Sequence, residues 1–163
     1  MAVAMLMTGC VSNIKDGVSL LEAGKYEEAI NVFQLEIQEE KNLAEANRGV
    51  GLAYFELGDY EQATLYFEKA LVNEAKETAS LYHLMGTCYM YCENYEGAVS
   101  SFDKALLLED CTETMKQEMM LNKIVAYEKM MDWESARVAA DNYLQAYPND
   151  EAVKTEAEFL ATR

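Results

Sequence analysis

The most regular feature of the chain is a short pattern that returns four times: a turn residue, an aromatic residue, an acid and an alanine. The four copies occupy residues 24–29, 58–63, 93–98 and 131–136, and their aromatic residues are 34, 35 and 38 positions apart. In the first three copies a phenylalanine follows the alanine four positions later, on the same helical face: Ala29 and Phe33, Ala63 and Phe67, Ala98 and Phe102. Each copy therefore predicts a turn followed by the start of a helix.

A second set of positions precedes each turn and predicts the other helix of a hairpin. Glycine and tyrosine recur there in the second and third copies, at Gly51, Tyr54, Gly86 and Tyr89. Small residues let two helices approach closely, so we expect tyrosine and phenylalanine to fill the space between successive hairpins. The end copies depart from the pattern: Glu36 stands where a later alanine belongs, Ile124 replaces the glycine and Ala140 the phenylalanine.

The spacing and the residue types resemble the tetratricopeptide repeat over residues 10–148. This resemblance implies an all-α, right-handed α-α solenoid of about four helix pairs in one domain, residues 10–163. The expected repeats are about 10–43, 44–77, 79–112 and 117–148. The three extra residues before the fourth repeat should lengthen the connection or add a helical turn. A capping helix is expected over 149–163, begun by Asn149 and Asp150.

The composition supports a helical, strongly acidic protein. Hydrophobic residues make up 51% of the chain, proline occurs once, and the formal net charge is −16. Such a charge repels phosphate backbones and anionic lipid headgroups, so neither nucleic acid nor a lipid surface is an expected partner. A basic or neutral protein partner fits this charge.

The first ten residues resemble the end of a bacterial lipoprotein signal peptide. Residues 1–9 are apolar, and Met7, Thr8 and Gly9 precede Cys10 as in the lipidation box of that family. The resemblance implies a lipidated Cys10, loss of residues 1–9, and a protein held outside the bacterial cell membrane by its lipid. The apolar region is short and lacks a preceding basic residue, so we expect the gene to begin upstream of Met1. The alternative is an incidental cysteine in a cytoplasmic protein.

Residues with possible chemistry are few. Cys88 and Cys92 share a helical face, and His83, the single histidine, lies about 140° around the helix from Cys88. This arrangement completes neither a metal site nor a cysteine–histidine pair, so we expect no metal, no cofactor and no small-molecule substrate. With Cys111, these cysteines are expected to be free and mostly buried thiols. A metal- or thiol-dependent activity at the three residues is kept as a further hypothesis.

In the tetratricopeptide family the first helix of each pair lines a concave groove. The resemblance places nine residues of this chain there: Arg48, Leu52, Phe55, His83, Thr87, Tyr91, Leu121, Val125 and Glu128. Their mixture of aromatic, aliphatic and charged side chains suits a peptide segment. The leading hypothesis is a non-enzymatic adaptor that binds a partner protein in this groove. The alternative is a structural protein, soluble and cytoplasmic, that associates with itself.

Overall fold

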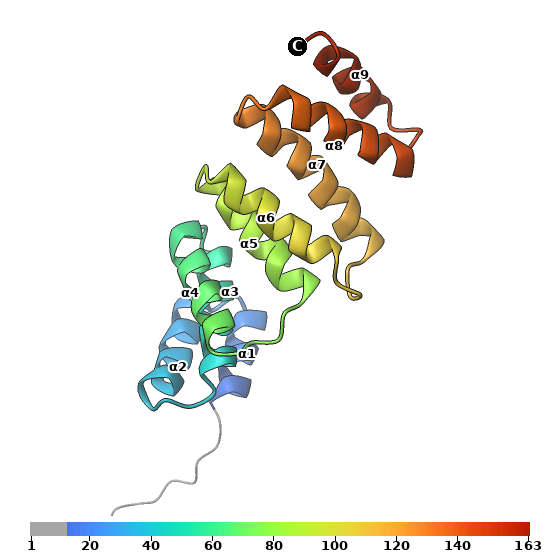
Figure 1. The fold of residues 1–163 in the computed structure, drawn as a ribbon. Helices are drawn as coiled ribbons and strands as arrows, with labels where there is room; N and C mark the ends of the chain where they lie inside the picture. Colours follow the sequence, from blue (N-terminus) through green and yellow to red (C-terminus); the bar gives the residue numbers. More distant parts are fainter. Residues whose placement is uncertain (1–12) are drawn as a thin grey trace, which may run out of the picture.

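The computed structural model describes residues 13–163, which fold into nine α-helices and contain no strand. In chain order these are α1 (Ile14–Glu22), α2 (Tyr26–Gln38), α3 (Leu43–Glu56), α4 (Tyr60–Val72), α5 (Ala79–Tyr91), α6 (Tyr95–Leu106), α7 (Glu113–Lys129), α8 (Trp133–Ala146) and α9 (Glu151–Leu160). Figure 1 shows them stacked into an elongated array, with α1 and α9 toward opposite ends. Within the described residues, no helix is long and apolar enough to cross a membrane.

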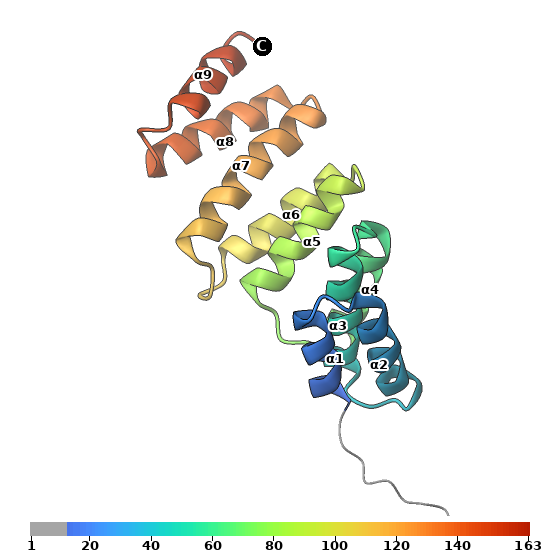
Figure 2. The ribbon, with the colours of Figure 1, turned by 180° about the vertical axis from the view of Figure 1, so that it is seen from behind.

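The helices pack as four antiparallel pairs, α1–α2, α3–α4, α5–α6 and α7–α8, and α9 packs against α8. Each pair meets the next through an even-numbered and an odd-numbered helix: α2 packs on α3, α4 on α5, and α6 on α7. In addition α1 contacts α3 and α5 contacts α7, so the odd-numbered helices run along one side of the array (Figure 2). We call this side the odd-helix face. The expected all-α solenoid of four helix pairs with a capping helix is confirmed.

The turn inside each pair is made by two successive residues, and in the last three pairs the side chain of the second residue caps the next helix. The first residue adopts a left-handed backbone conformation: Gly24 (φ 72°), Gly58 (φ 77°), Glu93 (φ 58°) and Met131 (φ 57°). At the second turn, for example, the Asp59 amide donates to the Tyr54 carbonyl, which closes the end of α3 as a Schellman motif. The Asp59 side chain then accepts from the Gln62 amide and caps α4. The whole reversal therefore needs only three residues.

The repeated glycines and phenylalanines pack against each other within a helix pair. Phe33, Phe67 and Phe102 are fully buried. A Cβ built on Gly86 would lie 2.4 Å from the Phe102 ring, and one on Gly51 would lie 2.6 Å from the Phe67 ring. These rings therefore fill space inside their own pair, not only between successive pairs as the sequence suggested. The glycines are required because any side chain would occupy the volume of the ring.

In the fourth pair the large and the small side chain have exchanged helices. Ile124 on α7 stands where the other pairs have glycine, and Ala140 on α8 stands where they have phenylalanine; both are buried in one apolar cluster. The large side chain has moved from the second helix to the first. Helix α7 has 17 residues against 13 in α5, while α6 has 12 against 13 in α4, so the three extra residues of the spacing lie in α7. They add a helical turn, the second of the two expected outcomes.

Glu36 on α2, which stands where the repeat pattern has alanine, is buried. Its side chain is 1% exposed; Oε1 accepts from the Asn13 amide at 2.8 Å, and Oε2 accepts from Nδ2 of Asn42 at 2.6 Å. These hydrogen bonds, the Asn42 one first, hold the pKa of Glu36 below its ordinary value despite burial. The carboxylate therefore fastens the start of α1 and the α2–α3 turn to one point.

Candidate functional site

The nine residues expected in the groove lie on three helices of the odd-helix face. Arg48, Leu52 and Phe55 are on α3, His83, Thr87 and Tyr91 on α5, and Leu121, Val125 and Glu128 on α7. Within each helix they are three or four positions apart and so share one side. Arg48, Tyr91 and Val125 are exposed, and the other six are half-buried.

Some apolar members of the set pack against the core, and others are exposed on the surface. Leu52 packs against the apolar cluster centred on α5 and α6, and Leu121 packs against the cluster of the fourth pair. Val125 is 40% exposed and Tyr91 is 63% exposed. Large apolar side chains at this level of exposure are what a binding surface presents to a partner.

Phe55 and Tyr91 are joined by a third aromatic residue that the sequence did not single out for binding. The ring of Tyr60 on α4 stacks on Tyr91 with centroids 4.1 Å apart and planes 6° from parallel. Its edge meets Phe55 at 5.7 Å. We call these three residues the aromatic patch. It bridges the second and third helix pairs, and the exposed ring of Tyr91 forms its outer surface.

The polar members of the set differ in their surroundings. Nε2 of His83 lies 3.5 Å from Oε1 of Glu118 on α7, but it forms no hydrogen bond with any described residue. The Thr87 hydroxyl donates to the His83 carbonyl at 2.9 Å and is therefore engaged within α5. This part of the face links α5 to α7 and carries a negative charge on Glu118, whose side chain is 56% exposed.

Glu128 meets a second acid at the far end of the face. Burial, together with hydrogen bonding and like-charge repulsion from Glu156 on α9, raises the pKa of Glu128 to about 7. Oε1 of Glu128 is enclosed and has no hydrogen-bond partner among the described residues. Near neutral pH a substantial fraction of the Glu128 carboxyl groups is therefore protonated.

The cysteines do not join His83 in a site. Cys88, Cys92 and Cys111 are free thiols; Cys88 is buried and the other two are half-buried. Burial raises the pKa of Cys88 to about 12, so its thiol stays protonated and weakly nucleophilic. Across residues 13–163 no three histidine, cysteine or acidic residues lie close enough to hold a metal ion. Cys10, the expected lipidation site, lies outside the described residues.

Sequence reasoning missed Tyr60, Glu118 and Glu156. Tyr60 belongs to the recurring turn pattern, and that role concealed its contact with the next pair. The two acids are ordinary members of a sequence with 29 acidic residues. Only the pattern of helix-to-helix contacts, which the sequence does not display, brings Glu118 beside His83 and Glu156 beside Glu128.

Solved structures with similar folds share little sequence with this chain. YrrB, a TPR protein with an unusual peptide-binding site, is 18% identical, with 94% of this chain and 77% of YrrB covered and a TM-score of 0.77. MamA from Desulfovibrio magneticus RS-1 is 19% identical, with 95% and 87% covered and a TM-score of 0.70. A tetratricopeptide repeat protein from Parabacteroides merdae ATCC 43184 is 18% identical, with 91% and 56% covered and a TM-score of 0.63. At this identity the likeness extends to the fold alone.

Sequence comparison identifies the family. None of the curated proteins matches this chain. Two family models of the tetratricopeptide repeat match residues 15–79 and 79–110. The matched span ends before the fourth helix pair, which is the pair that exchanges glycine and phenylalanine for Ile124 and Ala140. With the solenoid fold and the repeated turn, these matches show that the chain belongs to the tetratricopeptide-repeat family.

Proposed function

We propose that this protein is a non-enzymatic adaptor that binds a segment of a partner protein on its odd-helix face. The observation that carries the proposal is the aromatic patch of Phe55, Tyr60 and Tyr91. Aromatic side chains that are held rigidly and left exposed contribute strongly to protein binding, because they bury much apolar area at a small entropic cost.

The geometry of the patch favours a bound segment over a flat contact. Tyr60 fixes Tyr91 by stacking at 4.1 Å, so Tyr91 is preorganised although it is 63% exposed. Val125 is 40% exposed and lies on α7, two positions beyond α3 in the row of odd-numbered helices. It offers a second apolar contact on the same face. A segment several residues long would cover both. The peptide-binding site named for YrrB, on a similar fold, agrees with this proposal.

A catalytic role is not part of the proposal, because no group on the face is activated for chemistry. The Cys88 thiol is buried with a pKa raised to about 12. Glu128, with a pKa raised to about 7, faces another acid, Glu156.

Peptide selection tests the proposed function. A random peptide library displayed on phage is selected against the full chain, and the selected peptides are measured by fluorescence anisotropy. Phe55→Ala combined with Tyr91→Ala should weaken binding at least tenfold, since truncating a buried aromatic contact costs about 1–2 kcal/mol. Leu65→Ala is the matched control: Leu65 is 41% exposed but belongs to α4, an even-numbered helix.

The two variants give opposite expectations. Circular dichroism should show the same helical content in both, and only the Phe55/Tyr91 variant should lose affinity. Equal affinity in that variant, or equal loss with Leu65→Ala, would refute binding at the aromatic patch.

We also propose that Cys10 carries the lipid that anchors the protein outside the bacterial cell membrane. The support is the sequence Met7, Thr8, Gly9 and Cys10, which resembles a lipidation box. Fatty-acid labelling of the product of the complete gene tests it. Label that disappears in Cys10→Ser supports the anchor, and an unlabelled wild-type protein in the soluble fraction rejects it.

A further inference from the structure

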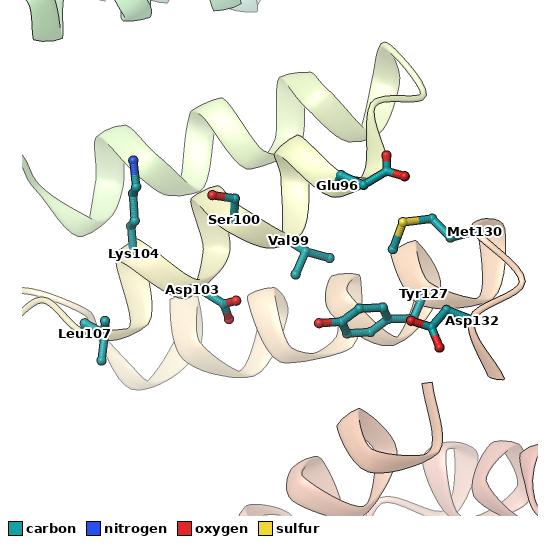
Figure 3. Close-up of a pocket in the computed structure, with 9 residues that line it drawn as sticks. All are labelled: Glu96, Val99, Ser100, Asp103, Lys104, Leu107, Tyr127, Met130 and Asp132. Carbon is teal, nitrogen blue, oxygen red and sulfur yellow. The ribbon is translucent and has the colours of Figure 1, made fainter. Parts of the chain in front are cut away.

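A pocket of about 690 Å³ lies between the third and fourth helix pairs, on the side of the even-numbered helices (Figure 3). Helix α6 and its C-terminal end supply one wall, the end of α7 forms the floor, and the start of α8 closes one end. The lining residues are Glu96, Val99, Ser100, Asp103, Lys104, Leu107, Tyr127, Met130 and Asp132. We call this hollow the α6–α8 cleft.

The inner surface of the α6–α8 cleft is apolar. Val99 points from α6 toward Tyr127, and Met130 lies beside them (Figure 3). Val99 is only 9% exposed, whereas Leu107 at the open end is 86% exposed. A smaller pocket of about 240 Å³ shares Tyr127 and continues along α8. The hollow can therefore accept a long side chain with an apolar stem.

Carboxylates surround this apolar surface, and the nearby cations are already engaged. Lys123 forms an ion pair with Asp103. Nζ of Lys104 lies 5.2 Å from the centre of the Tyr82 ring, and Figure 3 shows its side chain directed away from the cleft. The side chain of Glu96 has no hydrogen bond or ion pair to any other residue between 13 and 163. The cleft thus keeps an excess of negative charge.

Asp132 adds to that charge while it caps α8. It accepts a hydrogen bond from the Ser135 amide at 3.1 Å, and this bonding to Ser135 holds the pKa of Asp132 below its ordinary value. The group therefore remains ionised at any pH near neutrality. Together with Glu96 it places two carboxylates at the end of the cleft where Met130 lies.

We propose that the α6–α8 cleft binds a lysine or arginine side chain of a partner protein. The aliphatic stem packs on Val99, Tyr127 and Met130, and the charged end reaches Glu96 and Asp132. Long cationic side chains divide themselves in this way between apolar and charged surroundings. Charge-assisted hydrogen bonds to carboxylates are about twice as strong as neutral ones.

The charge of the chain decides between possible occupants. A second copy would bring a net charge of −16 toward an acidic cleft, and repulsion opposes that contact. A basic segment of a different protein meets no such penalty. The cleft lies away from the aromatic patch, so this second contact does not depend on the function proposed for the odd-helix face.

The test uses side-chain analogues with the full, isotope-labelled chain. Butylguanidinium imitates an arginine side chain, and butylurea has the same shape without the charge. Butylguanidinium should shift the NMR amide signals of Val99, Tyr127 and Met130 with saturation, at a dissociation constant of about 1–10 mM for a ligand of this size. Butylurea should bind at least about fivefold more weakly.

A matched pair of variants separates the cleft from the general charge of the protein. Glu96→Gln should weaken butylguanidinium binding about fivefold. Glu27→Gln removes the acid at the same place of the first repeat, on α2, and should change nothing. Equal binding of butylurea, shifts that map elsewhere, or an equal effect of Glu27→Gln would overturn the proposal. Shifts of the same amides with protein concentration alone would assign the cleft to a second copy instead.

Discussion

The left-handed turn positions allow a stabilising substitution that removes a side chain. Gly24 and Gly58 occupy this position in the first two pairs, but Glu93 and Met131 occupy it in the other two at φ 58° and 57°. A residue with a Cβ pays about 1–2 kcal/mol to adopt this conformation. Glycine avoids that strain but loses about 0.5–1 kcal/mol more backbone entropy on folding. Met131→Gly should therefore stabilise the protein by about 0.5–1 kcal/mol.

The side chain of Met131 contributes little to this balance because it is 71% exposed. Met131→Ala tests that point, since alanine removes the side chain but keeps the Cβ, and it should leave stability nearly unchanged. Urea unfolding followed by circular dichroism and by the fluorescence of Trp133, the single tryptophan, measures both variants near the altered turn. Met131→Gly that is no more stable than Met131→Ala would refute the backbone explanation.

Four further substitutions test other parts of the structure. Ile124→Gly and Ala140→Phe should each destabilise the protein by about 2–4 kcal/mol, and the double variant should recover about 2–3 kcal/mol of the sum in urea unfolding. Gly86→Ala should cost about 1–2 kcal/mol, because the clash with the Phe102 ring at 2.4 Å outweighs the better helix propensity; a higher melting temperature would contradict this. The raised pKa of Glu128 means that its stabilising contribution is complete below about pH 4.5 and is lost as pH rises through about 7. Glu128→Gln should therefore change little at pH 4 and stabilise by about 1–2 kcal/mol at pH 8 once solvent screening is included; equal effects at both pH values would contradict the raised pKa.

The fold could be predicted from the sequence because each repeat contains the residues that determine its own helices and turn. Ala63 and Phe67 share a helical face, and the turn residues before them fix where the helix starts. These are local rules that need no knowledge of the other repeats. Glu36 is a residue that these local rules do not cover. The partners of its carboxylate, Asn13 and Asn42, lie 23 and 6 positions away, so its burial depends on tertiary contacts.

The candidate site was less accessible to sequence reasoning for the same reason. The resemblance assigned nine positions to one face, but it did not indicate which of them touch. Tyr60 connects Phe55 to Tyr91 only because α4 packs on α5. The α6–α8 cleft likewise depends on how α6 stands beside α7 and α8, which no residue pattern specifies. Relations within a helix are periodic, whereas relations between helices depend on the full set of side-chain volumes.

The exchange of side-chain sizes in the fourth pair limits where two repeats of this gene could recombine and still encode a well-packed protein. Gly86 and Phe102, like Ile124 and Ala140, are 16 positions apart and belong to one helix pair. A crossover between pairs, near residue 112, transfers both members and preserves the total volume. A crossover inside a pair would set Ile124 against phenylalanine, or glycine against alanine, leaving either a clash or a void. The unit that can be duplicated or shuffled is therefore the whole hairpin, and single helices are not interchangeable parts.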